Sequence, residues 1–252
     1  MTTHNIEEGI NSIMAKLDRA LKAPQIIFIE GNIGAGKTTL LSEIERSEYF
    51  KAQFPNKTIK YVYEPVKEWL EYKDTNGIDI LSHFYRDQGK FAFSFQWYVF
   101  MTRIKAIQVA IDTGADLVFV ERSIFTDKNV FMKSLYQKEK ITEIEMKMYN
   151  DWFDWIANQF LRCNYAFVYL SLSTELAYVR IKKRARDAES IIEYDYLDLL
   201  NKNHDEWLLR SNKVDGRVLT IPATFNYEVI NEIGDVLKLI KGFIGTVFND
   251  ED

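Results

Sequence analysis

A glycine-rich segment directly after an apolar run is the feature that most restricts the fold of this chain. Residues 26–30 read IIFIE, a short β-branched run that predicts a buried strand. The next residues read GNIGAGKT and match the pattern GxxxxGK[ST], in which successive backbone N–H groups surround phosphate oxygens. A helix that follows directs the positive end of its dipole at the same point. The segment therefore predicts a nucleoside triphosphate site on a strand–loop–helix unit.

The residue types in this phosphate loop (residues 31–39) suit that chemistry. The glycines permit a tight turn, Lys37 would bridge the β- and γ-phosphates, and the Thr38 hydroxyl would bind Mg²⁺. A glycine-rich turn that binds nothing is the structural alternative, but the preceding strand and the helix-compatible LLSEIE that follows favour the phosphate site. We expect the donor, ATP or another nucleoside triphosphate, to contact Gly31, Asn32, Ile33, Gly34, Ala35, Gly36, Lys37, Thr38 and Thr39.

Composition favours one domain that acts on small molecules. The 252 residues are 47% hydrophobic, enough for one substantial core, and we expect that core in residues 24–252. The formal net charge is −5, with 37 acidic against 32 basic residues, which disfavours a nucleic-acid partner. The one cysteine, Cys163, lies in a segment that reads as the end of a helix. It cannot form an internal disulfide and suits a reducing compartment.

Residues 1–23 are expected to form an N-terminal extension. Between residues 5 and 22, apolar side chains recur at helical spacing among acidic ones, which predicts an amphipathic helix packed on the domain or on a partner. The segment lacks an apolar signal core and is more acidic than an organelle transit peptide. No stretch approaches the length of a membrane span. We therefore expect a soluble, cytoplasmic protein with no membrane partner.

Four further apolar, β-rich runs follow the first one, at residues 58–64, 117–121, 165–171 and 217–221. Long helical patterns lie between them, notably at residues 91–113 and 142–161. This alternation predicts an α/β fold with a five-stranded parallel sheet and helices on both faces. Ligands bind such sheets at the carboxyl ends of the strands.

Acidic and basic residues occur at two of those strand ends. Glu64 closes the second run before Pro65, and a carboxylate there can take the proton of an attacking hydroxyl group. Glu121 ends the third run and would hold Mg²⁺ directly or through water. Arg122, the next residue, can bond both Glu64 and the acceptor oxygen. The alternatives are a solvated acidic strand end and a plain surface arginine.

A basic run, RIKKRAR, covers residues 180–186 in a chain that is acidic overall. Arg180 and Arg184 share a helix face, whereas Arg186 falls off that face, which predicts a lid that closes on the triphosphate. By itself such a run is more often a solvated face or a nuclear-import patch. The phosphate loop elsewhere in the chain favours the lid.

One face of the helical pattern at residues 91–113 carries Gln96, Val99 and Arg103. Polar groups on an apolar helix need partners, and Asp127 could satisfy Arg103. Gln96 and the Arg103–Asp127 pair would then form a hydrogen-bonding wall for a flat heterocycle. Aromatic side chains available for the other walls are Trp69, Phe84, Tyr85, Phe95 and Phe131, although each one alone is more often a core residue.

With these residues in view, the chain resembles the cellular and viral deoxynucleoside kinases related to deoxycytidine and deoxyguanosine kinase. The resemblance runs from residue 26 nearly to the end. It rests on GNIGAGKTT, EPVKEW, FSFQWYVFMTRI, ERSIFTD and RIKKRARDAE, in the order usual for that family. It implies a P-loop kinase fold with an arginine-rich lid, a deoxynucleoside as substrate, and a homodimer joined through helices. For a viral member, the location implied is the host cytoplasm.

The resemblance also assigns roles to individual residues. It makes Glu64 the general base and Arg122 its partner, with Lys37 in phosphoryl transfer and Gln96 as the amide that reads the base. Nucleoside-pocket positions implied are Leu81, Trp69, Phe84, Phe95, Val99 and Phe131. Tyr85 and Glu189 would hold the sugar 3′-hydroxyl, the lid would consist of Arg180, Arg184 and Arg186, and Thr38 and Glu121 would serve Mg²⁺.

Relatives that prefer deoxycytidine or purine deoxynucleosides carry an arginine and an aspartate at the positions of Arg103 and Asp127, which thymidine-preferring relatives usually lack. We therefore expect deoxyadenosine, deoxyguanosine or deoxycytidine to be preferred over thymidine, with a role in nucleotide salvage. The alternatives are a nucleoside monophosphate kinase of the thymidylate kinase type and a non-catalytic nucleotide-binding protein. A GTP-dependent switch is disfavoured because the nearest guanine-reading candidate has His204 where aspartate is needed.

Overall fold

The protein is built around one five-stranded sheet. Its computed structural model describes residues 23–160, 163–184, 192–211, 214, 217–225 and 230–248. All strand pairs are parallel, in the order β2-β3-β1-β4-β5. The strands are β1 (Gln25–Gly31), β2 (Ile59–Val62), β3 (Leu117–Glu121), β4 (Asn164–Ser171) and β5 (Val218–Pro222). The predicted α/β fold and five-stranded parallel sheet are confirmed.

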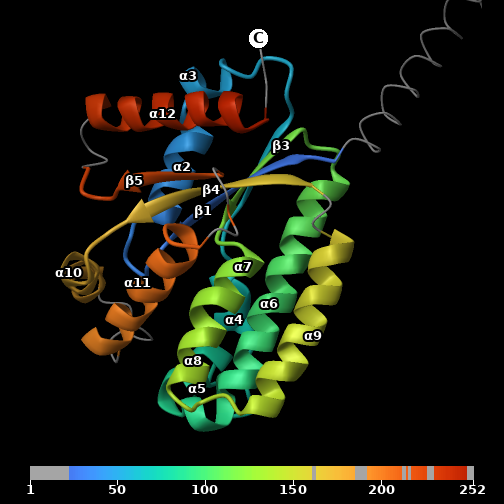
Figure 1. The fold of residues 1–252 in the computed structure, drawn as a ribbon, viewed down its shortest axis with the longest axis vertical. Coiled ribbons are helices and arrows are strands. Elements are labelled where there is room, and N and C mark those ends of the chain that lie inside the picture. The colour runs from blue at the N-terminus through green and yellow to red at the C-terminus, as the bar shows by residue number, and fades with distance from the viewer. Residues whose placement is uncertain are drawn as a thin grey trace, which may run out of the picture.

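The central strands are apolar on both faces because helices cover both faces (Figure 1). Ile27 and Ile29 of β1 pack with α2 (Lys37–Arg46) and α12 (Ile230–Phe248) on one face of the sheet. Ile26 and Phe28 point to the opposite face, toward α6 (Gln88–Asp112) and α11 (Tyr194–Leu208). All four of these β1 side chains are fully buried. The continuous apolar run in the sequence reflects this double coverage.

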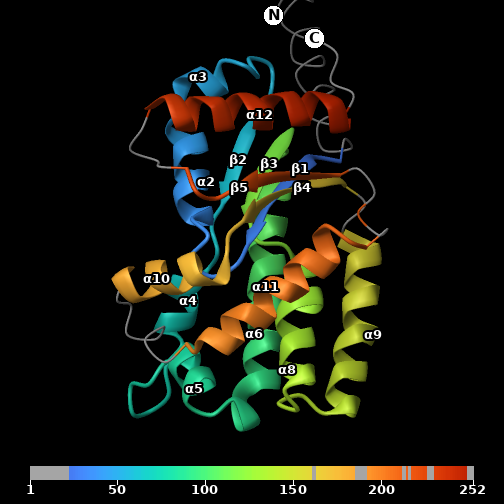
Figure 2. The ribbon, with the colours of Figure 1, turned by 60° about the vertical axis from the view of Figure 1, so that its left-hand side comes forward.

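Beyond the carboxyl ends of the strands lies a helical region (Figure 2). It has its own aromatic core. Phe84, Phe100, Tyr149 and Phe153 are among its buried side chains. The region consists of α4 (Val66–Glu71), α5 (Ile80–Arg86), much of α6, α7 (Ile124–Thr126), a π-helix η1 (Asp127–Met132), α8 (Lys133–Gln137) and α9 (Glu143–Phe160). Two further helices are α3 (Glu48–Lys51) and α10 (Thr174–Arg184). This region forms one side of the cavity described below.

The structure departs from the predicted elements most clearly in three places. Helix α6 begins at Gln88 rather than near residue 91, because the Asp87 side chain accepts a hydrogen bond from the backbone N–H of Lys90 and caps the helix there. Strand β2 ends at Val62 instead of residue 64, because the Glu64 N–H faces the Glu121 carboxylate, 3.5 Å away, and not a strand partner. Cys163, expected at a helix end, immediately precedes β4.

None of the helices within the described ranges combines the length and apolar character that crossing a bilayer requires. The expected extension at residues 1–23 lies, except for its last residue, outside the described residues.

Candidate active site

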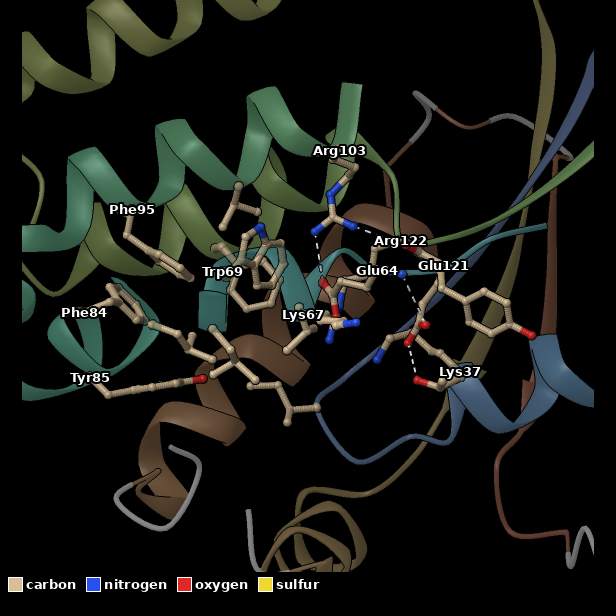
Figure 3. A pocket seen from close by; sticks show the side chains of 18 of the residues that line it. Lys37, Glu64, Lys67, Trp69, Phe84, Tyr85, Phe95, Arg103, Glu121 and Arg122 are labelled. Atoms are coloured by element: carbon tan, nitrogen blue, oxygen red, sulfur yellow. Dashed lines mark hydrogen bonds and ion pairs between the residues drawn. The ribbon is translucent and has the colours of Figure 1, made fainter. Parts of the chain in front are cut away.

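A cavity of about 960 Å³ opens at the carboxyl ends of the strands. The phosphate loop forms one end of it, and α4, α5 and α6 form the other (Figure 3). This is the position at which parallel α/β sheets bind ligands. Its two ends differ in character, since one is lined by backbone and charged groups and the other by aromatic side chains.

The phosphate loop connects β1 to α2. Gly36 has φ 93° and precedes the first residue of α2, a left-handed conformation that favours glycine. A Cβ atom on Gly31 would lie 2.8 Å from the carbonyl oxygen of Leu170, so the loop passes too close to β4 for a side chain. Both glycines therefore have a backbone reason for their place in the loop.

Lys37, the first residue of α2, is turned into the loop. Its Nζ donates a hydrogen bond to the carbonyl oxygen of Asn32 at 2.9 Å, and the side chain is buried. Burial, together with the nearby charge of Arg122, lowers the pKa of Lys37 from 10.5 to about 7. An anion placed in the loop would stabilise the charged form of this ammonium group.

Thr38 and Glu121 present two oxygen donors side by side. The Thr38 hydroxyl donates to the Glu121 carboxylate at 2.6 Å. Hydroxyl and carboxylate oxygens suit Mg²⁺, which takes its remaining ligands from phosphate and water. The described residues contain no cluster of three or more His, Cys, Asp or Glu side chains that could hold a metal by themselves. A magnesium site here would therefore depend on the phosphate donor.

Glu64 lies between two guanidinium groups that approach the same carboxylate oxygen. Arg103 Nη2 donates to Glu64 Oε1 at 2.9 Å, and Arg122 Nε forms an ion pair with that oxygen at 3.2 Å (Figure 3). Burial alone would raise the pKa of Glu64, but Arg122, Arg103 and Lys37 outweigh it and lower the pKa from 4.5 to about 2. The carboxylate is thus ionised at neutral pH. Both ion pairs involve Oε1. Oε2 can therefore accept a hydrogen bond from the hydroxyl group of a phosphoryl acceptor.

Arg103 also forms a two-pronged pair with Asp127, the first residue of η1. Its Nε lies 2.9 Å from Asp127 Oδ2, and its Nη2 lies 3.3 Å from Asp127 Oδ1. Asp127 is fully buried, which raises its pKa, and the charge of Arg103 partly offsets this effect. A third bond runs from Arg103 Nη1 to the carbonyl oxygen of Glu121 at 3.2 Å. Arg103 thereby connects α6, η1 and the ends of β2 and β3.

Aromatic side chains line the end of the cavity farthest from the phosphate loop. Phe84 and Phe95 stack with ring centroids 4.5 Å apart, and Trp69 meets Phe95 edge to face at 5.8 Å. The Trp69 indole N–H donates to the Thr102 hydroxyl at 3.0 Å, which fixes the plane of the indole. Gln96 is buried among these groups, and its Oε1 has no hydrogen-bond partner in the described part of the chain. A flat, hydrogen-bonding ligand would satisfy that oxygen.

Comparison with known proteins agrees with this geometry. The family model for deoxynucleoside kinases matches residues 27–244. The chain belongs to the deoxynucleoside kinase family. It is therefore a phosphotransferase with a hydroxyl group of a deoxynucleoside as acceptor and a nucleotide as phosphate donor.

Individual relatives cover most of the kinase. The chain is 29% identical to human deoxycytidine kinase over 88% of this chain and 91% of the relative. It is 29% identical to the probable deoxycytidine kinase of Fowlpox virus over 90% of this chain and 92% of that protein. It is also 30% identical to mitochondrial thymidine kinase 2 of Macaca fascicularis, over 84% of this chain and 75% of the relative. The relatives thus differ in the base that their names specify.

Most residues that the sequence singled out line this one cavity. From the phosphate loop these are Ile33, Gly34, Gly36, Lys37, Thr38 and Thr39. From the rest of the kinase they are Glu64, Trp69, Leu81, Phe84, Tyr85, Phe95, Gln96, Val99, Arg103, Glu121, Arg122, Phe131 and Arg184. Phe131 lies under the guanidinium of Arg122, whose carbon is 5.0 Å from the ring centroid.

The other expected site residues lie behind the cavity or outside the described residues. Gly31, Asn32 and Ala35 are buried in the turn of the phosphate loop, and Asp127 is buried behind Arg103. The Arg180 guanidinium donates to the carbonyl oxygen of Ala223 at 2.8 Å, next to β5. Arg186 and Glu189 fall in residues 185–191, which are not described.

Tyr196 and Lys67 are among the cavity residues that were not predicted as part of the site. Tyr196 of α11 is buried and lines the cavity, with its pKa raised to about 12 mainly by burial. Lys67, the second residue of α4, lies at the cavity wall. Lys67 lies only three residues after Glu64, at the start of a helix, so its place near the site could have been predicted from the sequence. Tyr196 offered none, because the cavity wall it joins is assembled from distant parts of the chain.

Proposed function

We propose that this kinase transfers the γ-phosphate of ATP, or of another nucleoside triphosphate, to the 5′-hydroxyl of a deoxynucleoside, giving a 5′-monophosphate for nucleotide salvage. The observation that carries the proposal is the position of the ionised Glu64 carboxylate, between the phosphate loop and the aromatic end of the cavity. Arg103 and Arg122 both bind its Oε1. A hydroxyl group bonded to Oε2 would lie in the position for attack on a phosphate held by the loop.

The roles of the charged groups follow from their places. Glu64 accepts the hydroxyl proton as the new P–O bond forms, while the bond from the γ-phosphorus to the β–γ bridging oxygen breaks and the nucleoside diphosphate leaves. Arg122 stabilises the charge that develops on the transferring group. Lys37 binds the donor phosphates, and Arg184 covers them from α10. Thr38 and Glu121 would hold Mg²⁺, which neutralises charge on the β- and γ-phosphates when bound. No phosphorylated enzyme is formed in this direct transfer.

We propose that deoxyadenosine, deoxyguanosine or deoxycytidine is preferred over thymidine. The support is the buried Arg103–Asp127 pair together with the unpaired Gln96 amide oxygen. The guanidinium offers donors and the carboxylate offers acceptors, so the pair suits a base edge that carries an acceptor nitrogen beside an amino group. Thymine carries a C5 methyl group, which a wall made of a guanidinium and a carboxylate accommodates poorly.

The test is phosphorylation of all four deoxynucleosides by the purified protein with ATP, with deoxynucleoside monophosphates as alternative acceptors. We expect activity on deoxyadenosine, deoxyguanosine or deoxycytidine that exceeds the activity on thymidine. Activity confined to the monophosphates would identify a nucleotide kinase instead. We do not expect that result, because a phosphate dianion would have to bind beside the ionised Glu64. ATP binding without transfer to any acceptor would indicate a non-catalytic binder.

We also propose a homodimer formed through α6 and α9. Exposed apolar side chains follow one face of α9, where they continue across a Trp97–Trp152 edge-to-face contact onto α6. They are Met101, Ile144, Met148, Trp152 and Trp155. Light scattering after size-exclusion chromatography should give twice the chain mass, and Trp155→Glu should shift it to one chain mass. A wild-type monomer at micromolar concentration would contradict the dimer.

A further inference from the structure

Glu30 is a buried carboxylate that the proposed phosphoryl transfer does not use. It is the next-to-last residue of β1, follows four apolar residues and is fully shielded from solvent. Burial raises the pKa of Glu30, while hydrogen bonds from Ser123 and Thr126 and the charges of Arg122 and Arg103 act in the opposite direction. A carboxylate is costly at such a position unless its oxygens have partners.

Both oxygens of Glu30 accept hydrogen bonds from the segment that follows β3. The backbone N–H of Ser123 donates to Oε1 at 2.9 Å, and the Thr126 hydroxyl donates to Oε2. The Ser123 hydroxyl in turn accepts from the N–H of Thr126 at 3.2 Å, which caps α7. Glu30 therefore connects the end of β1 with the first turn of the helix after Arg122.

The residue between Glu121 and Ser123 has an unfavourable backbone. Arg122 has φ 64°, in the left-handed region that side-chain-bearing residues rarely adopt. Such a conformation persists only where the surrounding contacts enforce it. Three of the contacts that hold it here come from the end of β1.

Three consecutive β1 residues hold the turn at three points. The N–H of Arg122 donates to the carbonyl oxygen of Ile29 at 3.0 Å, and Arg122 Nη1 donates to the carbonyl oxygen of Gly31 at 3.0 Å. Between them, the Glu30 carboxylate holds the N–H of Ser123. The two carbonyl contacts are main-chain acceptors that any residue supplies, so the side chain of Glu30 is the one sequence-specific element of the three.

We propose that Glu30 is a positioning residue for phosphoryl transfer, which holds the Arg122–Ser123 turn in the left-handed conformation that directs the Arg122 guanidinium to Glu64. The inference rests on the proposed function, in which Arg122 acts on Glu64 and on the transferred phosphate. With the Glu30 contacts removed, Arg122 can relax to an ordinary backbone conformation. Its guanidinium then moves away from Glu64 Oε1, from which Nε is 3.2 Å distant.

Two variants of Glu30 separate hydrogen bonding from charge. Glu30→Met keeps the size of the side chain but removes both acceptors. Glu30→Gln keeps the hydrogen bonds, because its amide oxygen can accept from the N–H of Ser123 and its amide nitrogen can donate to the Thr126 hydroxyl. We expect kcat to fall roughly 10- to 100-fold in Glu30→Met, with KM values for ATP and deoxynucleoside within about threefold of wild type. Glu30→Gln should stay within about fivefold of wild-type kcat.

A double-mutant cycle with Arg122→Met tests whether Glu30 acts through Arg122. Rates are normalised to the sites that bind ATP in each preparation, so that a loss of folded protein does not count as a loss of kcat. In the Arg122→Met background, Glu30→Met should lower kcat by less than about threefold further. The positioning role would be overturned if the two effects on kcat multiplied in the double variant. It would also be overturned if Glu30→Met kept the kcat of the wild type and only lowered the melting temperature.

A milder variant covers the case in which Glu30→Met fails to fold. Thr126→Val removes one donor and keeps the shape of the side chain, so kcat should fall roughly 3- to 10-fold with unchanged KM values. An unchanged kcat in Thr126→Val would refute the inference. If the wild-type protein is active on deoxynucleosides and these variants are too, only the positioning role fails. An inactive wild type would overturn the proposed function as well.

Discussion

Replacing Arg103 should destabilise the kinase more than replacing Asp127, and replacing both should cost less than the sum. Arg103→Met leaves the fully buried Asp127 carboxylate without the guanidinium that bonds both of its oxygens. Breaking a buried pair in this way costs about 3–5 kcal/mol. In Asp127→Ala the guanidinium keeps its bonds to Glu64 at 2.9 Å and to the Glu121 carbonyl at 3.2 Å. The cost of that variant is therefore about 1–3 kcal/mol.

The double variant contains neither a buried carboxylate without Arg103 nor a guanidinium group without Asp127. Glu64 still faces Arg122 and Lys37 in that protein. The free energy of unfolding should drop by only about 1–3 kcal/mol, against a sum of about 4–8 kcal/mol for the single variants. Urea unfolding of the four proteins, followed by circular dichroism, measures the cycle. Additivity within about 0.5 kcal/mol would refute the coupling that the structure indicates.

The same variants test substrate preference. In Arg103→Met/Asp127→Ala the thymidine-to-deoxycytidine rate ratio should rise, because the charged pair has been replaced by apolar groups that accommodate the thymine methyl group. Absolute kcat should fall on every deoxynucleoside, since Arg103 also grips the Glu64 carboxylate. An unchanged ratio would remove the pair from the specificity role.

Three further predictions concern the donor site and the aromatic wall. Because the pKa of Lys37 is lowered to about 7 and a triphosphate favours its charged form, ATP affinity should fall as pH rises from 7 to 9 with proton uptake on binding. Lys37→Arg, which stays charged, should lose this pH dependence. Calorimetry in buffers of different ionisation enthalpy measures the number of protons taken up on ATP binding. An equal pH dependence of ATP affinity in both proteins would refute the mechanism. Chelation of Mg²⁺ should stop phosphoryl transfer, and Thr38→Ala should raise the Mg²⁺ concentration for half-maximal rate roughly tenfold, whereas Thr38→Ser should not. Thr102→Val, which removes the acceptor of the Trp69 indole N–H, should raise the KM for deoxynucleoside about fivefold with little change in kcat, and an unchanged KM would count against a positioned indole.

The sheet was predictable because its signal is local. Buried strands of a parallel sheet read as continuous β-branched runs, so residues such as Ile26, Ile27 and Ile29 identify a strand without any knowledge of its neighbours. The phosphate loop is local in the same way, since loop, lysine and threonine are adjacent in the chain. The pairing of Arg103 with Asp127 was predictable from the polar character of both residues in apolar surroundings.

Other features depend on contacts between distant segments and could not be predicted. That Arg103 and Arg122 both meet Oε1 of Glu64 depends on how α6, β2 and β3 converge. The left-handed backbone of Arg122 goes against the ordinary preference of arginine and results from contacts with β1. Sequence patterns also gave no sign that η1 is a π-helix or that Tyr196 closes the cavity wall.

Turnover of the Glu64→Gln variant tests the central claim most directly. The amide keeps the shape of the side chain but cannot accept the hydroxyl proton. With the best deoxynucleoside and ATP, kcat should fall roughly 100- to 10,000-fold, while the dissociation constants of both ligands, measured separately by calorimetry, stay within about threefold of wild type. Turnover close to that of the wild type would show that Glu64 is not the base and that another group accepts the proton.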